Sequence, residues 1–298
     1  MKKNVKTMIT AFLSVTVMGI SLVGCGNESI QSSDGSSADV SSVQSASSTN
    51  TQKESIEEKV LVDEKGIKIT ATGFGKNDSE LFPSEKALFL EIVNGSEQPI
   101  TVGLVNSSVN GYMVQSDLSL NVEPGETNTL PAQFDETQLT RCGITTFSEM
   151  GFVISIENYE TFETILESEP ISINTTANVT VDYDESGTVA YDKDGIKIVL
   201  KGTYEEEYLG QCIGVYVSNQ SDKNITVAGA EKVSVNGKEV TPYFGSDVMK
   251  EKHDITHISF DEAENISKIE SFEGSFCIYD YDTGDVLVEK TESVTVTY

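Results

Sequence analysis

The sequence predicts an all-β fold: two tandem antiparallel β-sandwiches that follow a signal peptide and a disordered linker. Three observations support this prediction. The 298 residues contain an internal duplication, both copies consist of short segments in which apolar and polar residues alternate, and Gly and Asn turn signals separate these segments. Self-similarity of this length indicates repeated domains, and short alternating segments bounded by turn residues are typical of antiparallel sheets.

The duplication is visible in the order and spacing of residues. The segment 63–73 recurs as 192–202, and Asp, Gly, Ile, Lys, Ile and Gly keep their places within it. Because later matches follow in the same order, we predict two domains of one fold, over 59–176 (repeat 1) and 177–298 (repeat 2). These later matches include Leu90 with Val215, Asn94 with Asn219, Asn110 with Asn236, and Phe134 with Phe260.

Each repeat opens with a predicted hairpin and continues with alternating strands. In repeat 1, residues 60–63 and 67–73 flank a turn that ends at Gly66. The alternation that follows predicts strands that bury one face. The alternating apolar residues are Leu88, Leu90 and Ile92 in repeat 1, and Ile213, Val215 and Val217 in repeat 2. The last strands are predicted at 152–156 and 171–173, and at 276–278 and 294–296.

Turn and cap residues separate these strands. The dipeptides Asn110-Gly111 and Asn236-Gly237 favour tight two-residue hairpin turns. One short helix is predicted in each repeat, because an Asp is followed three residues later by a Gln or Glu, as in a reciprocal helix cap. The two pairs are Asp135 with Gln138 and Asp261 with Glu264.

The amino terminus indicates export. Three lysines precede an apolar run from Met8 to Gly24 that is diluted by Thr, Ser and Gly. A stable membrane-spanning helix needs about 20 strongly apolar residues, so this run predicts a cleavable signal peptide over 1–24.

The apolar run ends in Leu22-Val23-Gly24-Cys25, which resembles the lipobox of bacterial lipoproteins. The resemblance implies that a diacylglyceryl group is attached to the thiol of Cys25 and that cleavage makes Cys25 the mature amino terminus. Two acyl chains anchor a protein durably, whereas one chain binds only marginally, at about 0.8 kcal/mol per buried CH₂. We therefore expect membrane lipid to hold the chain on the extracytoplasmic face of the cell membrane.

Residues 25–58 comprise this cysteine and a Ser-rich linker, which is expected to be disordered because it has too little apolar surface to offset its ordering entropy. With the two β-rich repeats, the arrangement resembles tandem immunoglobulin-like lipoproteins of clostridia and their relatives. The resemblance implies an immunoglobulin-like β-sandwich in each repeat. It carries over no catalytic residues, because the domains of that group are mostly of unknown function.

The composition argues against several classes of function. A formal net charge of −28 makes nucleic acid and anionic lipid headgroups poor partners. The sequence has no G-x-S-x-G elbow, Gly-rich phosphate loop or H-E-x-x-H motif, so we expect neither enzyme activity nor a cofactor. Pairs of carboxylates can support glycoside hydrolysis, which keeps a hydrolase as the less favoured alternative.

Three tyrosines of repeat 2 are candidates for ligand binding. By strand parity Tyr216, Tyr279 and Tyr281 face outward, whereas the matching positions of repeat 1 carry Glu or Ser. A surface that differs between two copies of one fold suggests acquired binding, here of a small ligand or a glycan. The alternative is that the rings only stabilise cross-strand pairing.

A short acidic segment is the candidate metal site. Asp182, Asp184 and Ser186 follow the first half of a calcium loop, D-x-D-x-S-G. The twelfth position of such a loop requires a bidentate acid, but this position is Lys193. A hairpin or interdomain turn uses the same residue types for backbone reasons and is the alternative interpretation.

The histidines and the other cysteines give weaker signals. His253 and His257 are expected at the surface of a strand, where residues four apart are too distant to share a metal ion. Parity places Cys212 and Cys277 on outward faces, so they could form a disulfide if their strands are neighbours, and otherwise stay reduced. Cys142 is expected to be a small buried residue on the capped turn.

These observations lead us to expect a membrane-anchored extracellular lipoprotein that acts as a non-enzymatic binding, accessory or sensor module through its β-sandwich surfaces. Its partner would be an extracellular protein or a glycan. Binding of a small ligand or glycan is the alternative function.

Overall fold

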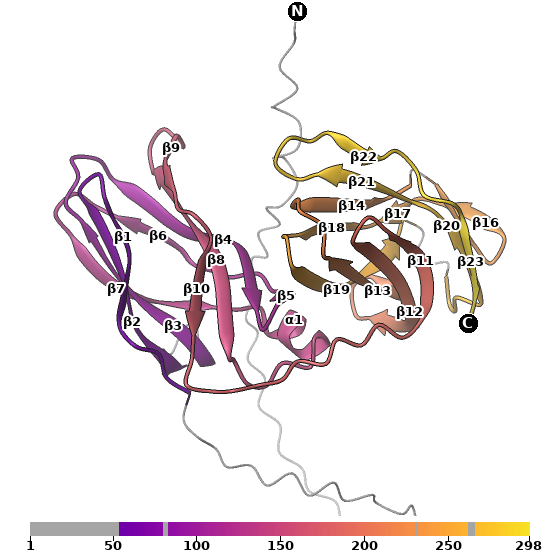
Figure 1. Cartoon of the computed structure of the whole chain (residues 1–298), viewed down its shortest axis with the longest axis horizontal. Coiled ribbons are helices and arrows are strands. Elements are labelled where there is room, and N and C mark those ends of the chain that lie inside the picture. The colour runs from indigo at the N-terminus through magenta and orange to yellow at the C-terminus, as the bar shows by residue number, and fades with distance from the viewer. Residues whose placement is uncertain (1–53, 80–82, 231, 262–265) are drawn as a thin grey trace, which may run out of the picture. The chain divides into compact units, whose positions relative to one another are not determined.

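Strands and one short helix form the regular secondary structure of the residues that the computed structural model describes, which are 54–79, 83–230, 232–261 and 266–298 (Figure 1). These residues belong to one unit, Asn50–Tyr298. The signal peptide, Cys25, most of the linker and Glu264 lie outside the described residues. No helix in the described ranges is long and apolar enough to cross a bilayer.

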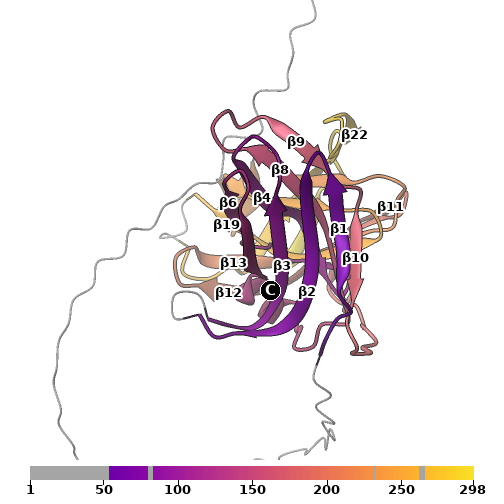
Figure 2. The same cartoon turned by 90° about the vertical axis from the view of Figure 1, so that its left-hand side faces the viewer.

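Repeat 1 has two antiparallel sheets, and side chains from both form one hydrophobic core. The first sheet has the strand order β1-β2-β3-β7, and Figure 2 shows β1, β2 and β3 side by side. Its strands are β1 (Lys59–Glu64), β2 (Ile67–Asn77), β3 (Ser84–Asn94) and β7 (Thr127–Gln133). The second sheet has the order β10-β8-β4-β5, with β6 on β4 and β9 on β8. Its strands are β4 (Ile100–Val109), β5 (Tyr112–Met113), β6 (Ser119–Val122), β8 (Glu149–Asn158), β9 (Thr164–Glu167) and β10 (Ile171–Asn174).

Repeat 2 begins with a sheet of the same order, β11-β12-β13-β19. Its strands are β11 (Thr188–Lys193), β12 (Ile196–Glu206), β13 (Gly210–Asn219) and β19 (Lys252–Phe260), and β17 (Pro242–Tyr243) pairs with β19. Two smaller sheets share its hydrophobic core, β18-β14-β21-β22 and β16-β15-β20-β23. Their strands are β14 (Ile225–Gly229), β15 (Val233–Val235), β16 (Lys238–Val240), β18 (Gly245–Val248), β20 (Ser271–Gly274), β21 (Phe276–Asp280), β22 (Val286–Val288) and β23 (Val294–Thr297). The predicted all-β fold of antiparallel sheets is confirmed.

The predicted hairpin turns form because their residues accept left-handed backbone. Asn110 and Gly111 have φ of 51° and 83°, and Asn236 and Gly237 have φ of 52° and 77°. Positive φ at both central positions is what a type I′ turn requires, and this turn matches the twist of the flanking strands. The turn at Gly66 is of the same kind, with φ of 77°.

The predicted helix of repeat 1 is α1 (Glu136–Arg141), and the carboxylate of Asp135 caps it by accepting the N–H of Gln138 at 2.7 Å. The expected reciprocal bond from Gln138 to Asp135 is absent. The Oε1 atom of Gln138 instead accepts the N–H of Gln115 at 2.7 Å, because the chain just before β6 lies beside the start of the helix. The bond from Gln115 therefore fixes the side chain of Gln138.

A buried asparagine occupies the same place in each repeat. Asn94 donates to the carbonyl oxygens of Gln98 and Val122 at 2.8 and 2.9 Å, and Asn219 donates to those of Lys223 and Val248 at 2.8 Å each. Both asparagines have no exposed surface. Each therefore ties the end of one sheet to a strand of another through the carbonyl of a buried residue, Val122 or Val248.

We expect Asn94→Ala or Asn219→Ala to lower the free energy of unfolding by about 1–3 kcal/mol, because a buried carbonyl, that of Val122 or Val248, would lose its donor. Urea unfolding measures this loss. The exposed Asn121→Ala is the matched control and should cost less than about 0.5 kcal/mol. Equal losses in all three variants would contradict this role.

Candidate functional site

The two repeats are joined by one parallel bridge between strands. Tyr112 of β5 pairs with His253 of β19, and the N–H of His253 donates to the carbonyl of Gly111 at 2.9 Å. This bridge makes one path of strands, β10-β8-β4-β5-β19-β13-β12-β11. Repeat 1 therefore covers the edge of β19 at His253, while β17 of repeat 2 pairs with β19 at Ser259 and Phe260.

Aromatic rings surround the bridge. The Tyr183 ring stacks on the His253 ring with centroids 3.7 Å apart, and the Tyr216 ring lies nearly parallel to it at 5.8 Å. The Tyr216 hydroxyl is 2.7 Å from Nδ1 of His253, within hydrogen-bond distance. Tyr183 comes from the chain between β10 and β11, and its hydroxyl donates to the carbonyl of Asn110 at 3.2 Å. We call Tyr112, Tyr183, Tyr216 and His253 the aromatic joint.

The expectation of surface histidines is wrong for His253, which is only 6% exposed. Both histidines do lie on a strand, and His257 is half-buried with its ring edge-on to Tyr204. The expected exposure of Tyr216 is also wrong, since this side chain is fully buried. Its parity is as predicted: Val215 and Val217 enter the core of repeat 2, whereas Tyr216 packs with the core of repeat 1. Repeat 1 covers the face that parity assigns to solvent.

The possible disulfide between Cys212 and Cys277 does not form. Cys212 lies on β13 opposite Tyr204, and Cys277 lies on β21 opposite Ala228, in different sheets. Both are free, as is Cys142, which is half-buried at the end of α1. Burial raises the pKa of the Cys212 thiol to about 11 and that of Cys142 to about 12, so both are protonated at neutral pH.

The structure does not bring the three candidate tyrosines together. Tyr279 is half-exposed on β21, on the same face as Cys277, while Tyr216 belongs to the aromatic joint. Tyr281, just beyond β21, is 38% exposed, and its hydroxyl donates to Oδ1 of Asn106 in repeat 1 at 3.1 Å. Tyr281 therefore reaches across the boundary between the repeats.

The segment with Asp182, Asp184 and Ser186 forms a turn that already holds a cation. The Lys201 ammonium donates to the carbonyls of Asp184 and Ser186 at 2.6 and 2.5 Å and pairs with the Asp184 carboxylate at 3.2 Å. Within the described ranges, no three His, Cys, Asp or Glu side chains are placed to share a metal ion. The turn interpretation of this segment is the one that the geometry favours.

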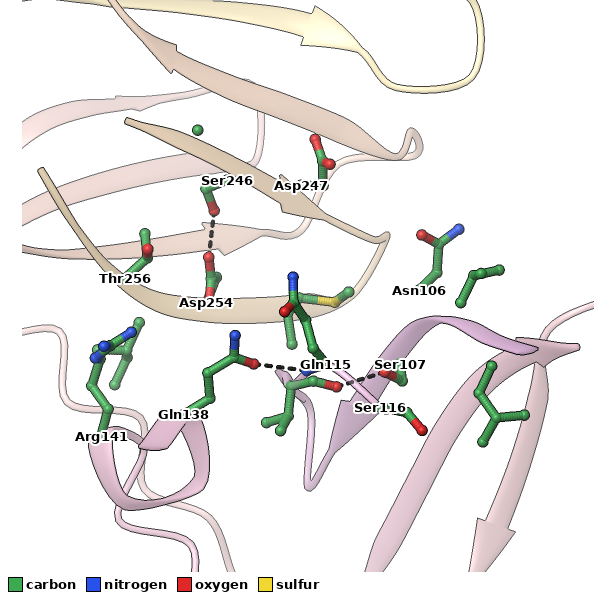
Figure 3. A pocket seen from close by; sticks show the side chains of 16 residues that line it. Asn106, Ser107, Gln115, Ser116, Gln138, Arg141, Ser246, Asp247, Asp254 and Thr256 are labelled. Atoms are coloured by element: carbon green, nitrogen blue, oxygen red, sulfur yellow. Dashed lines mark hydrogen bonds between the residues drawn. The ribbon is translucent and has the colours of Figure 1, made fainter. Parts of the chain in front are cut away.

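A pocket of about 440 Å³ lies beside the aromatic joint (Figure 3). Its walls come from β4, the chain after β5 and α1 in repeat 1, and from β18 and β19 in repeat 2. We call it the junction pocket. Its polar lining residues are Asn106, Ser107, Gln115, Ser116, Gln138, Arg141, Ser246, Asp247, Asp254 and Thr256.

Asp254 is the most perturbed acid of the junction pocket. Its carboxylate accepts the hydroxyl of Ser246 at 2.6 Å. Burial raises the pKa of Asp254 to about 6, although Ser246 and the Arg141 guanidinium both act to lower it. Arg141 itself pairs with Glu206 at 3.3 Å. A carboxyl that keeps some accessible surface but is desolvated in this way lies deep in a concave site.

A bulge in β4 shapes the opposite wall. The register between β4 and β8 shifts between Val105 and Ser108, and Asn106 adopts a left-handed φ of 52°. Such backbone is uncommon outside glycine and is often found at functional sites. Here it lets Asn106 line the pocket and accept the hydrogen bond from Tyr281.

The sequence pointed to only part of this site. Gln138 stood out as a cap residue and Tyr281 as a candidate ligand residue, but Arg141, Asp254 and Asn106 gave no signal of their own. These side chains meet because the two repeats dock. Docking brings Tyr112 of repeat 1 against Tyr183 and His253 of repeat 2, and these contacts join residues too distant in sequence for local patterns to show them.

Comparisons with known proteins add little about function. No family model and no curated protein sequence matches the chain. Among solved structures, the chain is similar to the YadV chaperone at 9% sequence identity and a TM-score of 0.23, over 70% of this chain and 92% of that one. A likeness at this level carries no argument about function.

We expect the neighbouring residues His253 and Asp254 to have opposite effects on how the free energy of unfolding changes with pH. Burial lowers the pKa of His253 from 6.5 to about 4, so between these values the unfolded chain binds more protons and stability is lost as pH falls. Burial raises the pKa of Asp254 from 3.8 to about 6, so the folded chain binds more protons there and stability is lost as pH rises. The charged neighbours are Glu185 and Lys252 for His253, and Arg141 and Asp247 for Asp254.

Relative to the wild type, Asp254→Asn should gain stability more steeply as pH rises from 4 to 6, and His253→Asn should gain it less steeply or lose it. Urea unfolding at half-unit intervals of pH measures both slopes. Slopes equal to that of the wild type in both variants would show that neither group is perturbed by burial.

Proposed function

We propose that this chain is a lipid-anchored, extracytoplasmic binding module without catalytic activity, and that the junction pocket is its binding region. The observation that supports the proposal is the pocket itself, which is lined by polar side chains from both repeats. Ligand sites commonly form at domain boundaries, with a few convergent polar groups and perturbed acids. Asp254 is such an acid, and Arg141 is one of the polar groups that line the same pocket.

The lining of the junction pocket favours binding over covalent chemistry. Hydroxyls line it, but the one beside Asp254, that of Ser246, is buried and donates to the carboxylate. Nucleophilic catalysis needs an exposed nucleophile beside a base that a third group orients. Binding of a ligand requires only hydrogen-bond donors and acceptors, and the polar side chains that line the pocket supply them.

A glycoside hydrolase is the second candidate, because Asp247 and Asp254 line the same pocket and a pKa of about 6 lets Asp254 hold a proton near neutral pH. Assays with nitrophenyl glycosides at pH 5–7 test it. Turnover that disappears in Asp254→Asn and in Asp247→Asn would replace the binding proposal with this one.

The anchor is tested on Cys25. Cells fed an alkyne fatty acid should label the wild-type chain and retain it in the membrane fraction, because the thiol of Cys25 carries the lipid. Cys25→Ala should lose both the label and the retention, whereas Cys142→Ser should keep both. An unlabelled wild-type chain would contradict the anchor.

The binding region is tested with a photoreactive residue on intact cells. Val105 lines the junction pocket and is 38% exposed, whereas Val60 on β1 is 48% exposed and lies elsewhere on repeat 1. We expect a photoreactive phenylalanine at position 105 to yield a discrete adduct and the same residue at position 60 to yield none. Equal labelling from both positions would remove the junction pocket as the binding region.

A further inference from the structure

We propose that the junction pocket binds an uncharged sugar unit, of monosaccharide or disaccharide size, with Tyr281 at its rim. This inference rests on the proposed function and names the ligand class of the same site. It follows from four properties of the pocket: the kinds of polar groups, their fixed orientation, their balance of charge, and the apolar side chains at the rim.

The polar groups match the chemistry of sugar hydroxyls, each of which both donates and accepts hydrogen bonds. Amides come from Gln115 and Gln138, carboxylates from Asp247 and Asp254, and hydroxyls from several Ser and Thr side chains. Arg141 adds a fork of donors that can reach two neighbouring hydroxyls. In Figure 3, Gln138 reaches toward Gln115, and Asp254 points to Ser246 on the side of repeat 2.

Two of these groups are held in place by the protein before any ligand arrives. Gln138 uses its carbonyl oxygen to accept the N–H of Gln115, which directs its amide nitrogen into the pocket (Figure 3). Asp254 uses one carboxylate oxygen to accept the hydroxyl of Ser246. Side chains fixed in this way lose little entropy on binding, which favours recognition of a small polar ligand.

The charges of the pocket favour a neutral ligand. Arg141 and the carboxylates of Asp247 and Asp254 line the same space. A cation would meet the Arg141 guanidinium, and an anion would meet two carboxylates in a chain whose formal net charge is already −28. A sugar hydroxyl can bond to groups of either sign without bringing a charge of its own.

The rim supplies the apolar contact that a sugar ring needs on its C–H face. Tyr281 and Val105 are each 38% exposed, so part of each side chain is open to a ligand. The Tyr281 hydroxyl donates to Asn106, which lines the pocket, and this bond is the reason that we assign Tyr281 to the rim. A volume of about 440 Å³ is near the lower end of ligand pockets and suits a mono- or disaccharide.

The test is titration calorimetry of the soluble chain, residues 26–298, with methyl glycosides of glucose, galactose, mannose and N-acetylglucosamine and with the disaccharides cellobiose and maltose. Glucosamine and glucuronate are the charged analogues, and arginine and glutamate are the comparison ligands. At least one neutral sugar should bind, and its charged analogues should bind about tenfold more weakly or not at all.

Variants then place the sugar in the pocket. Tyr281→Ala and Asp254→Asn should each weaken binding about tenfold, and Tyr281→Phe, which keeps the ring but loses the bond to Asn106, should weaken it only about threefold. Tyr159→Ala is the matched control, because Tyr159 is 45% exposed on repeat 1 and does not line the pocket. Thermal unfolding of each variant confirms that it is folded.

Binding of no neutral sugar, or binding that Tyr281→Ala and Asp254→Asn leave unchanged, would overturn this inference. If arginine or glutamate binds instead and the pocket variants abolish that binding, the sugar assignment is wrong and the proposed function stands. If every probe fails and position 105 yields no adduct on cells, the proposed function fails as well.

Discussion

The aromatic joint is the interaction on which the rest of the structure depends. His253 is held in its neutral form by burial, with the Tyr183 ring stacked on it and the Tyr216 hydroxyl at its Nδ1 atom. Tyr112 of repeat 1 packs against the Tyr183 and His253 rings and pairs with His253, which joins β5 to β19, and the core of repeat 1 covers Tyr216 on the outer face of β13. The contacts between the repeats also bring Arg141 and Gln138 of repeat 1 to the same pocket as Asp254 of repeat 2, and so they form the junction pocket.

The duplication explains why this joint occurs only once. The position of Tyr216 corresponds to Glu91 in repeat 1, and the position of His253 corresponds to Thr127, at the start of β7. Those residues are polar, and Thr127 is exposed. β7 also carries Pro131, which lacks an N–H and is a common feature of strands at sheet edges. One copy of the fold therefore carries a surface suited to solvent, while the other carries a surface suited to docking.

The same docking sets the electrostatics of the site. Asp254 follows His253 directly, and alternation along β19 sends the two side chains to opposite faces, one into the aromatic joint and the other into the junction pocket. Burial keeps the histidine neutral and favours the protonated form of the acid. Burial thus acts on both groups in the same direction, toward the uncharged form, although the pKa of about 6 leaves Asp254 mainly ionised at neutral pH.

The sequence predicts those features best that depend on residues close together in the chain. The type I′ turns at Asn110 and Asn236 follow from two residues each, and the Asp135 cap follows from a spacing of three. Parity along β13 correctly separated Val215 and Val217 from Tyr216. Parity assigns a side chain to a face, however, and cannot say what covers that face, which is why Tyr216 and His253 were wrongly expected at the surface.

The sequence by itself determined the all-β fold, its duplication and the turns that set each hairpin, because these depend on residues close together in the chain. Only the tertiary structure decided that Cys212 and Cys277 lie in different sheets, that Lys201 occupies the acidic turn, and that Tyr281 reaches Asn106. The physical reason is that each of these outcomes depends on strands whose pairing partners are set by packing between distant segments, and for the junction pocket by packing between the two repeats.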